Sequence, residues 1–131
     1  TLTFEEVTSW SFVYSDDGNY YQQSINGTTG YYNGLYVDAA TGKLVPNGST
    51  PNSAQFTTGA KISVPVSGKC TISVEAYQPQ YALYTIGGTA ADTTTAVSTY
   101  TYDSEEAGTV EIVSREALIF QKYPLSMQQR T

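Results

Sequence analysis

The chain of 131 residues has the length of one ordinary domain, which can build a hydrophobic core without disulfides or bound metal. Six Lys and Arg stand against twelve Asp and Glu, so the formal net charge is −6. This acidic field, without any basic cluster, excludes nucleic acid as a partner. No apolar run approaches the roughly 20 residues of a membrane-spanning helix, so no membrane span is predicted.

The sequence has no histidine and a single cysteine, Cys70. One cysteine cannot form an internal disulfide, and we interpret Cys70 as a small buried hydrophobe. The lack of histidine excludes His-dependent catalytic triads and His-containing metal sites. The carboxylates fall mostly on predicted strand faces and turns, where they are solvated charge, so we predict no catalytic residues and a protein that is not an enzyme.

Short runs of Val, Ile, Tyr, Thr and Phe recur between clusters of Gly, Pro, Asn and Asp, and no extended helical periodicity is present. A spacing of about ten residues between strand centres is typical of a sandwich. We therefore predict an all-β fold, an antiparallel β-sandwich of jelly-roll type. In chain order, the predicted strands are Phe4–Val7, Ser9–Tyr14, Tyr20–Ile25, Leu35–Asp38, Ala54–Thr57, Lys61–Pro65, Thr71–Ala76, Ala82–Ile86, Ser98–Tyr102, Thr109–Val113 and Leu118–Tyr123.

The strands are separated by turn signals in which glycine follows a polar residue or another glycine. Asn26-Gly27, Thr41-Gly42 and Gly87-Gly88 are predicted breaks of this kind. Residues 1–131 form one predicted domain without repeats. The polar segment Ser126–Thr131 is interpreted as a linker or terminal tail.

One turn carries the only pattern that suggests a metal. Asp16-Asp17-Gly18-Asn19 resembles an oxygen-rich loop that binds calcium, because hard cations prefer several carboxylate and amide oxygens. The same residues close ordinary β-turns, and we favour that interpretation. The prediction is therefore no metal and no cofactor, with Asp16 and Asp17 as the candidates for calcium.

The aromatic residues carry the functional prediction: the chain has twelve Tyr, one Trp and four Phe. Trp10, Phe12, Phe4 and Phe56 are expected in the core. Twelve tyrosines are not easily all buried, because each buried hydroxyl needs a hydrogen-bond partner. Exposed tyrosine offers a flat apolar face and a polar edge, which suits a sugar ring.

Two groups of tyrosines stand out. The first lies around the Asn-Gly turns, and the second lies in a predicted loop where glutamine amides flank Pro79. The alternative is that these tyrosines merely coat a sheet. Tyr100 and Tyr102 alternate on one predicted strand and, with Phe120, Lys122 and Tyr123, are secondary candidates. The first group is Tyr20, Tyr21, Tyr31, Tyr32 and Tyr36, and the predicted ligand-binding residues are Tyr77, Gln78, Gln80, Tyr81, Tyr84, Tyr31 and Tyr32.

Several segments in order along the chain carry a resemblance to a known type of module. They are Thr8–Phe12, Ile25–Gly30, Gly34–Leu44, Ala54–Phe56, Ile62–Val66, Tyr84–Ala91 and Val110–Val113. Together they cover most of the chain, which resembles a β-sandwich carbohydrate-binding module appended to secreted pectinolytic and xylanolytic enzymes of gut and rumen Firmicutes. The resemblance implies a secreted or cell-surface location, a polysaccharide ligand, and a catalytic domain on the same polypeptide. It assigns no binding residue.

Two kinds of such modules fit: one similar to the xylan-binding module of family 86, the other to the pectin-binding modules of family 77, which use lysines on galacturonate. A polyuronate groove needs converging cations. Lys43, Lys61, Lys69 and Lys122 are scattered over different predicted strands and turns, so xylan leads and pectin (homogalacturonan) is the alternative. We expect a monomer that binds an internal stretch of the polysaccharide.

Three alternative functions are left open by the sequence. An adhesin or protein-interaction domain would also use exposed tyrosines, because tyrosine is enriched at protein interfaces. A structural spacer domain would bind neither sugar nor protein. A lyase or esterase fragment would retain activity on chromogenic substrates.

Overall fold

A computed structural model describes residues 5–10, 24–32, 35–46, 54–77, 79–81, 83–116 and 118–130. Strands dominate these residues and every strand pair is antiparallel, which confirms the predicted all-β class. The elements are β1 (Glu5–Trp10), β2 (Ile25–Tyr32), β3 (Leu35–Pro46), β4 (Ala54–Phe56), β5 (Lys61–Val66), β6 (Cys70–Tyr77), the 3-10 turn η1 (Pro79–Tyr81), β7 (Tyr84–Ile86), β8 (Thr89–Ala90), β9 (Val97–Tyr102), β10 (Gly108–Ser114) and β11 (Leu118–Arg130).

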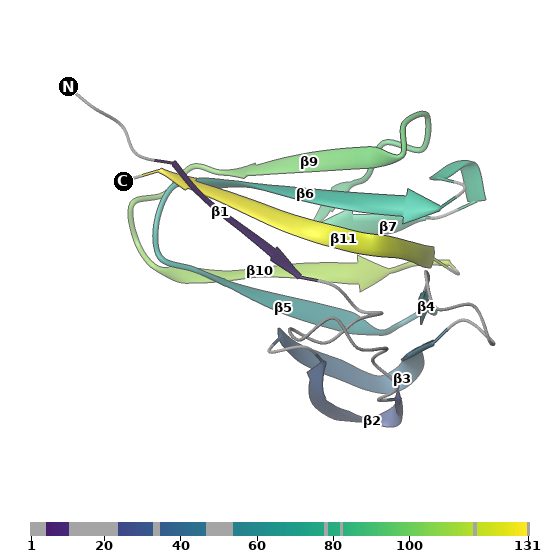
Figure 1. The fold of residues 1–131 in the computed structure, drawn as a ribbon. Coiled ribbons are helices and arrows are strands. Elements are labelled where there is room, and N and C mark those ends of the chain that lie inside the picture. The colour runs from purple at the N-terminus through teal and green to yellow at the C-terminus, as the bar shows by residue number, and fades with distance from the viewer. Residues whose placement is uncertain are drawn as a thin grey trace.

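The strands form two layers that pack face to face (Figure 1). One layer has the order β2-β3-β5-β10-β7-β8, and the other has β11, β6 and β9, with β1 paired along β11. The short strand β4 pairs with both β3 and β11 and joins the layers into one continuous sheet. The arrangement is a sandwich folded from a single bent sheet.

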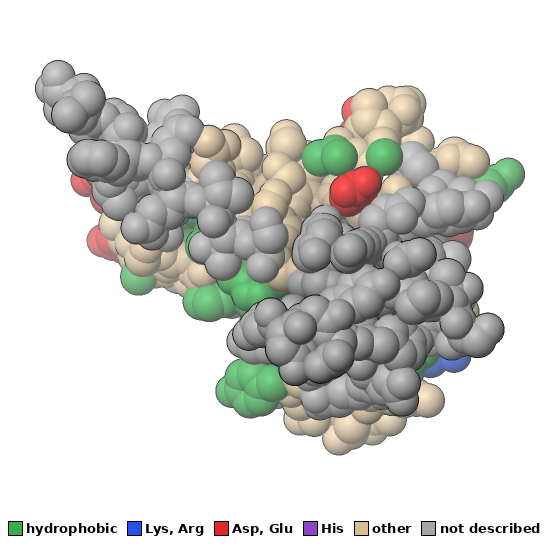
Figure 2. Space-filling view, in the orientation of Figure 1, with side chains coloured by type: hydrophobic (Ala, Val, Ile, Leu, Met, Phe, Trp, Pro, Cys, Tyr) green, Lys and Arg blue, Asp and Glu red, His purple; other side chains and the backbone are tan. Residues whose placement is uncertain are grey.

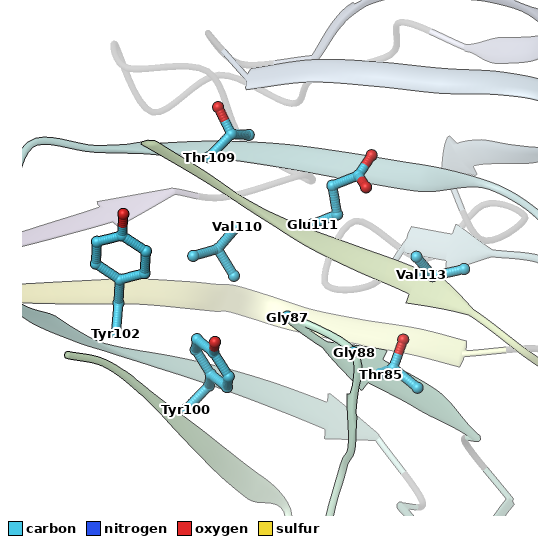
Figure 3. A pocket seen from close by; sticks show the side chains of 9 residues that line it. All are labelled: Thr85, Gly87, Gly88, Tyr100, Tyr102, Thr109, Val110, Glu111 and Val113. Carbon is cyan, nitrogen blue, oxygen red and sulfur yellow. The ribbon is translucent and has the colours of Figure 1, made fainter. Parts of the chain in front are cut away.

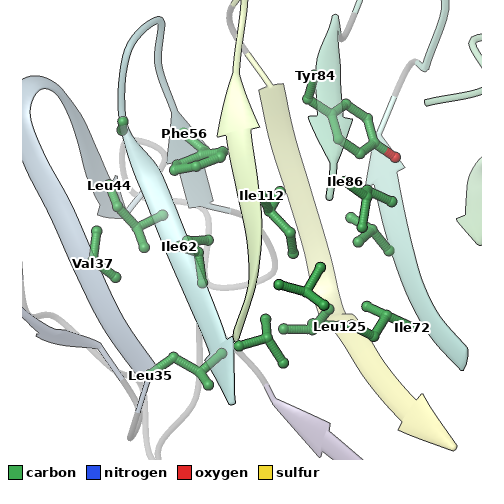
Figure 4. Close-up of a cluster of buried hydrophobic side chains, with 14 of the residues drawn as sticks. Leu35, Val37, Leu44, Phe56, Ile62, Ile72, Tyr84, Ile86, Ile112 and Leu125 are labelled. Carbon is green, nitrogen blue, oxygen red and sulfur yellow. The ribbon is translucent and has the colours of Figure 1, made fainter. Parts of the chain in front are cut away.

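Period-two alternation explains how these strands build the core. In β5, Ile62 and Val64 are buried while Lys61 and Pro65 are exposed. The register sets Ile62 beside Val37 of β3 and Ile112 of β10, so the apolar positions of neighbouring strands share one face. These side chains meet those of the other layer (Figure 4). Phe56 and Cys70 are buried as predicted, and the partly buried Trp10 packs against the same cluster.

Two glycine positions that the sequence predicts as breaks lie inside strands. Strand β3 pairs with β5 through Tyr36–Asp38 and with β4 through Leu44–Pro46, and the register against β2 shifts between these segments. Gly42 sits at this change with φ of 91°, and a Cβ there would lie 2.5 Å from the Thr58 carbonyl oxygen. The predicted breaks at Asn26-Gly27 and Thr41-Gly42 are therefore wrong, because these glycines form a bulge that bends paired strands without ending them.

Replacing Gly42 by alanine is expected to lower the free energy of unfolding by more than the roughly 1 kcal/mol of a left-handed alanine, because the added methyl group meets backbone oxygens. Gly27→Ala is the matched control: Gly27 has φ of 70°, and nothing lies within 4 Å of its Cβ position. Urea denaturation of both variants measures the difference. Equal losses would show that the close approach at Gly42 carries no cost.

The C-terminal prediction is also corrected. Ser126–Arg130 belong to the second half of β11, where they pair with β1 on one edge and, through Ser126–Gln129, with β6 on the other. Met127 is buried among the core side chains, so this segment is structural and not a linker. The predicted strands at Ser9–Tyr14 and Tyr20–Ile25 lie mostly outside the described residues.

Candidate functional site

An exposed pair of tyrosines lies on the β2–β3 hairpin. Tyr31 and Tyr36 are direct partners in the register, and their rings meet edge to face with centroids 5.5 Å apart and planes at 69°. Tyr31 is 64% exposed and Tyr36 is 39% exposed. Hydrophobic side chains show on the surface at the hairpin end of these strands (Figure 2). The pair therefore presents aromatic surface to solvent.

The register extends this pair across the layer. Tyr36 lies opposite Ser63 of β5, and Ser63 lies opposite Glu111 of β10. Directly opposed residues share one face of a sheet, and with Tyr31 these form a line across four strands. We call Tyr31, Tyr36, Ser63 and Glu111 the tyrosine row. With neighbouring strands about 4.8 Å apart, its three spacings cover roughly 14 Å.

The tyrosine row lies on the outer face of its layer. An adjacent residue on each of three strands, Val37, Ile62 and Ile112, is buried on the opposite face. Beside the row, Asp38 and Lys61 are register partners of opposite charge. The outer face therefore offers aromatic, hydroxyl and carboxylate groups next to a pair of balanced charges.

A second feature, which we call the edge groove, lies between β10 and β9 (Figure 3). Strand β7 pairs with β10 only at Ile112–Ser114, whereas β10 begins at Gly108, so the first half of β10 is not covered by β7. The groove has a volume of about 350 Å³. It is lined by Thr85, Gly87, Gly88, Tyr100, Tyr102, Thr109, Val110, Glu111 and Val113.

Tyr100 and Tyr102 point to the same side of β9, as predicted. Their register partners are Ile72 and Cys70, which belong to the core, and both tyrosines are partly buried against it. The Tyr102 hydroxyl donates a hydrogen bond of 2.9 Å to the Glu106 carbonyl oxygen. These two rings therefore close the sandwich edge and also form one wall of the groove.

The structure separates the predicted ligand-binding residues. Tyr81 is 67% exposed and Gln80 is also exposed, but both lie in η1 between β6 and β7, outside the strands that carry the tyrosine row. Tyr32 ends β2 and Tyr77 ends β6, and the structure describes neither side chain. The predicted residues that lie outside the described ranges are Gln78, Asp16 and Asp17.

The position of Tyr84 contradicts the prediction that this residue binds the ligand. It is 3% exposed and belongs to the core cluster, so its ring offers no face to a ligand. Its position explains this: Tyr84 opposes the buried Ser114 of β10, so both point inward. Its hydroxyl hydrogen-bonds the Ser98 side chain, which satisfies a polar group that burial removes from water.

The burial of Tyr84 predicts a stability change at alkaline pH. Burial raises the pKa of its phenol above 10.0, with the Ser98 hydrogen bond opposing the shift and the Asp92 charge adding to it. Burial likewise raises the pKa of the Cys70 thiol above 9.0. A group whose pKa is higher in the folded than in the unfolded protein makes its full contribution to stability at pH values below its unfolded-state pKa. That contribution is lost as the pH rises through its folded-state pKa.

The free energy of unfolding is therefore expected to fall as pH rises past these values. In Tyr84→Phe, the part of this fall above about pH 10 should disappear, while the part due to Cys70 remains. Urea denaturation at several pH values between about 8 and 11 measures both slopes. A slope that is the same in wild type and Tyr84→Phe would contradict the assignment.

The described part of the chain holds no cluster of potential metal ligands. Among these residues, no group of three or more His, Cys, Asp or Glu could hold a metal ion, and no helix is long and apolar enough to cross a membrane. The lowered pKa of Asp92 comes from hydrogen bonds donated by the Thr94 hydroxyl and backbone N–H, which close a local turn.

Comparison with protein-family models, curated proteins and solved structures found no match for the chain.

Sequence reasoning did not single out Ser63 and Glu111. Alternation along each strand places Ser63 and Glu111 opposite to buried Ile62 and Ile112, so their outward direction follows from the sequence. Their alignment with Tyr36 depends on which strands pair and in which register, and no local pattern contains that information.

Proposed function

We propose that the chain is a non-catalytic carbohydrate-binding module that holds an internal stretch of xylan on the tyrosine row. The observation that carries this proposal is the exposed Tyr31–Tyr36 pair, set in register with Ser63 and Glu111 on one outer face. The family resemblance of the sequence supports the same function.

The groups of the row match the chemistry of a sugar chain. The C–H face of a pyranose packs on an aromatic ring, while its hydroxyls take hydrogen bonds from groups such as Ser63 and Glu111. A line that runs across strands on an open face can accept the middle of a polymer. By analogy with nucleic-acid bases stacked on aromatic rings, each tyrosine contributes about 1–3 kcal/mol.

The charges favour a neutral polysaccharide over a polyuronate. Glu111 places a carboxylate in the row, and the chain as a whole has a net charge of −6. Lys61 lies opposite Asp38, and Lys69 forms an ion pair with Asp103 at 3.7 Å. Lys61 thus lies opposite a carboxylate in the β3–β5 pair, and Lys69 is paired with a carboxylate just beyond the ends of β6 and β9, whereas galacturonate binding needs cations that converge.

The module would act by tethering. Linked to a secreted hydrolase, it keeps the catalytic domain beside an insoluble substrate, so that the next encounter between them is effectively intramolecular. Modest affinity suits this role, because the enzyme must still move along the polysaccharide.

Affinity gel electrophoresis tests the proposal. The chain is run through gels that contain wheat arabinoxylan, glucuronoxylan, homogalacturonan, mixed-linkage glucan or xyloglucan. We expect retardation by arabinoxylan, weaker retardation by glucuronoxylan because of its acidic groups, and none by homogalacturonan. Retardation by homogalacturonan alone would favour the pectin-binding alternative, and retardation by no polysaccharide would overturn carbohydrate binding in favour of a protein partner.

A further inference from the structure

The edge groove continues the tyrosine row. Glu111 belongs to both, and the Gly87 N–H donates a hydrogen bond of 2.9 Å to the Glu111 carbonyl oxygen. The Tyr100 ring then packs on Gly87, since a Cβ at that glycine would lie 2.5 Å from the Tyr100 ring carbon Cζ. Glu111 therefore contacts Gly87, and Gly87, which has no side chain, contacts Tyr100.

The lining of the groove is mixed in the manner of a small ligand site. Its lining residues include the aromatic and apolar Tyr100 and Val110 together with the polar Thr85 and Thr109. A volume of about 350 Å³ is near the lower end of the range of roughly 300–1,000 Å³ for ligand pockets. The groove thus has room for a short substituent and not for a second polymer chain.

Both sides of the groove are held in place without a ligand. On one side, the two-residue turn Gly87-Gly88 closes the β7–β8 hairpin, with φ of 59° and 85°. On the other side, the hydrogen bond from Tyr102 to Glu106 fastens its ring to the segment that leads into β10. A site that is already shaped loses little entropy when it binds.

From this continuity we infer that the edge groove is a subsite for a neutral, single-sugar branch of the polysaccharide whose main chain lies on the tyrosine row. The inference rests on the proposed function and adds a preference for branched over linear xylan. The net charge of −6 disfavours an acidic branch, so the expected substituent is uncharged, such as an arabinofuranosyl unit.

Gly88→Asn tests the subsite with little risk to the fold. Gly88 has φ of 85°, nothing lies within 4 Å of its Cβ position, and asparagine tolerates this left-handed backbone better than most residues. The variant adds a side chain to the groove wall. Gly27→Asn is the matched control, because Gly27 has a similar φ of 70° and equally open surroundings but lies in the β2 bulge.

Isothermal titration calorimetry compares two oligosaccharides with the same β-linked xylose backbone, one linear and one with a single arabinofuranosyl branch. Wild type and Gly27→Asn should bind the branched one about three- to tenfold more tightly, the range of one net hydrogen bond. In Gly88→Asn this preference should vanish while affinity for the linear one stays unchanged. Equal binding of both by wild type, or a preference that survives in Gly88→Asn, overturns the subsite alone. Binding of neither overturns the proposed function together with it.

Discussion

Replacing Tyr31 by alanine is expected to weaken binding to arabinoxylan about five- to a hundredfold, because the variant removes one stacking platform from the tyrosine row. Tyr31 is the more exposed ring of the pair, so its loss should cost binding and leave folding nearly intact. Tyr36→Ala should act in the same direction. Affinity electrophoresis against arabinoxylan gives the dissociation constants of wild type and variants.

Tyr81→Ala is the matched control for this experiment. Tyr81 is as exposed as Tyr31, at 67% against 64%, but it lies in η1. We expect this variant to bind like wild type. A loss of affinity in Tyr81→Ala with none in Tyr31→Ala would place the ligand on the η1 segment and remove the tyrosine row from the site.

The Tyr31→Ala/Tyr36→Ala double variant measures how far the two rings act together. Their edge-to-face contact is expected to couple them by about 0.5–1.5 kcal/mol, so the two single losses should not simply add. Strict additivity in binding would indicate that each ring contacts the sugar independently of the other.

Phe56→Ala is expected to lower the free energy of unfolding by about 3–5 kcal/mol. Phe56 is fully buried in β4, opposite Leu44 of β3 and Leu118 of β11, where β4 joins the two layers. Its carbonyl oxygen also accepts a 2.9 Å hydrogen bond from the buried Ser114 hydroxyl. The variant leaves a cavity at the place where both layers depend on packing.

Urea denaturation followed by the fluorescence of Trp10, the single tryptophan, measures this loss. Trp10 is a suitable probe because it packs against the core. Val97→Ala, at a side chain that is 46% exposed on β9, is the surface control and should change stability by less than about 0.5 kcal/mol. A loss of similar size in both variants would contradict the central place given to Phe56.

Local patterns were enough to predict several core strands, among them β5, β6 and β10. Ile62-Ser63-Val64 alternates, and the structure buries Ile62 and Val64 and turns Ser63 outward. The same period predicted that Tyr100 and Tyr102 share one side of their strand, which they do. Alternation indicates to which face of its own strand each side chain points, and it does so wherever one face of that strand is buried.

The same patterns failed where a residue has two structural uses. Glycine after a polar residue indicates a turn, yet Gly27 and Gly42 serve a bulge within paired strands. Polar residues near a terminus indicate a tail, yet Ser126–Gln129 pair on both edges of β11. The pairing of β11 depends on strands distant in sequence, and the bulge depends on the register between β2 and β3. No local sequence pattern contains either the pairing or the register.

The all-β class, the alternating core and the surplus of tyrosine follow from composition and period, since each depends on neighbours within a few residues. Which tyrosines are exposed does not: Tyr84 faces the core while Tyr31 and Tyr36 face solvent, and all three occupy similar Tyr-rich segments. Strand pairing decided this difference, because register assigns each side chain to the inner or outer face and aligns residues from β2, β3, β5 and β10 into one row.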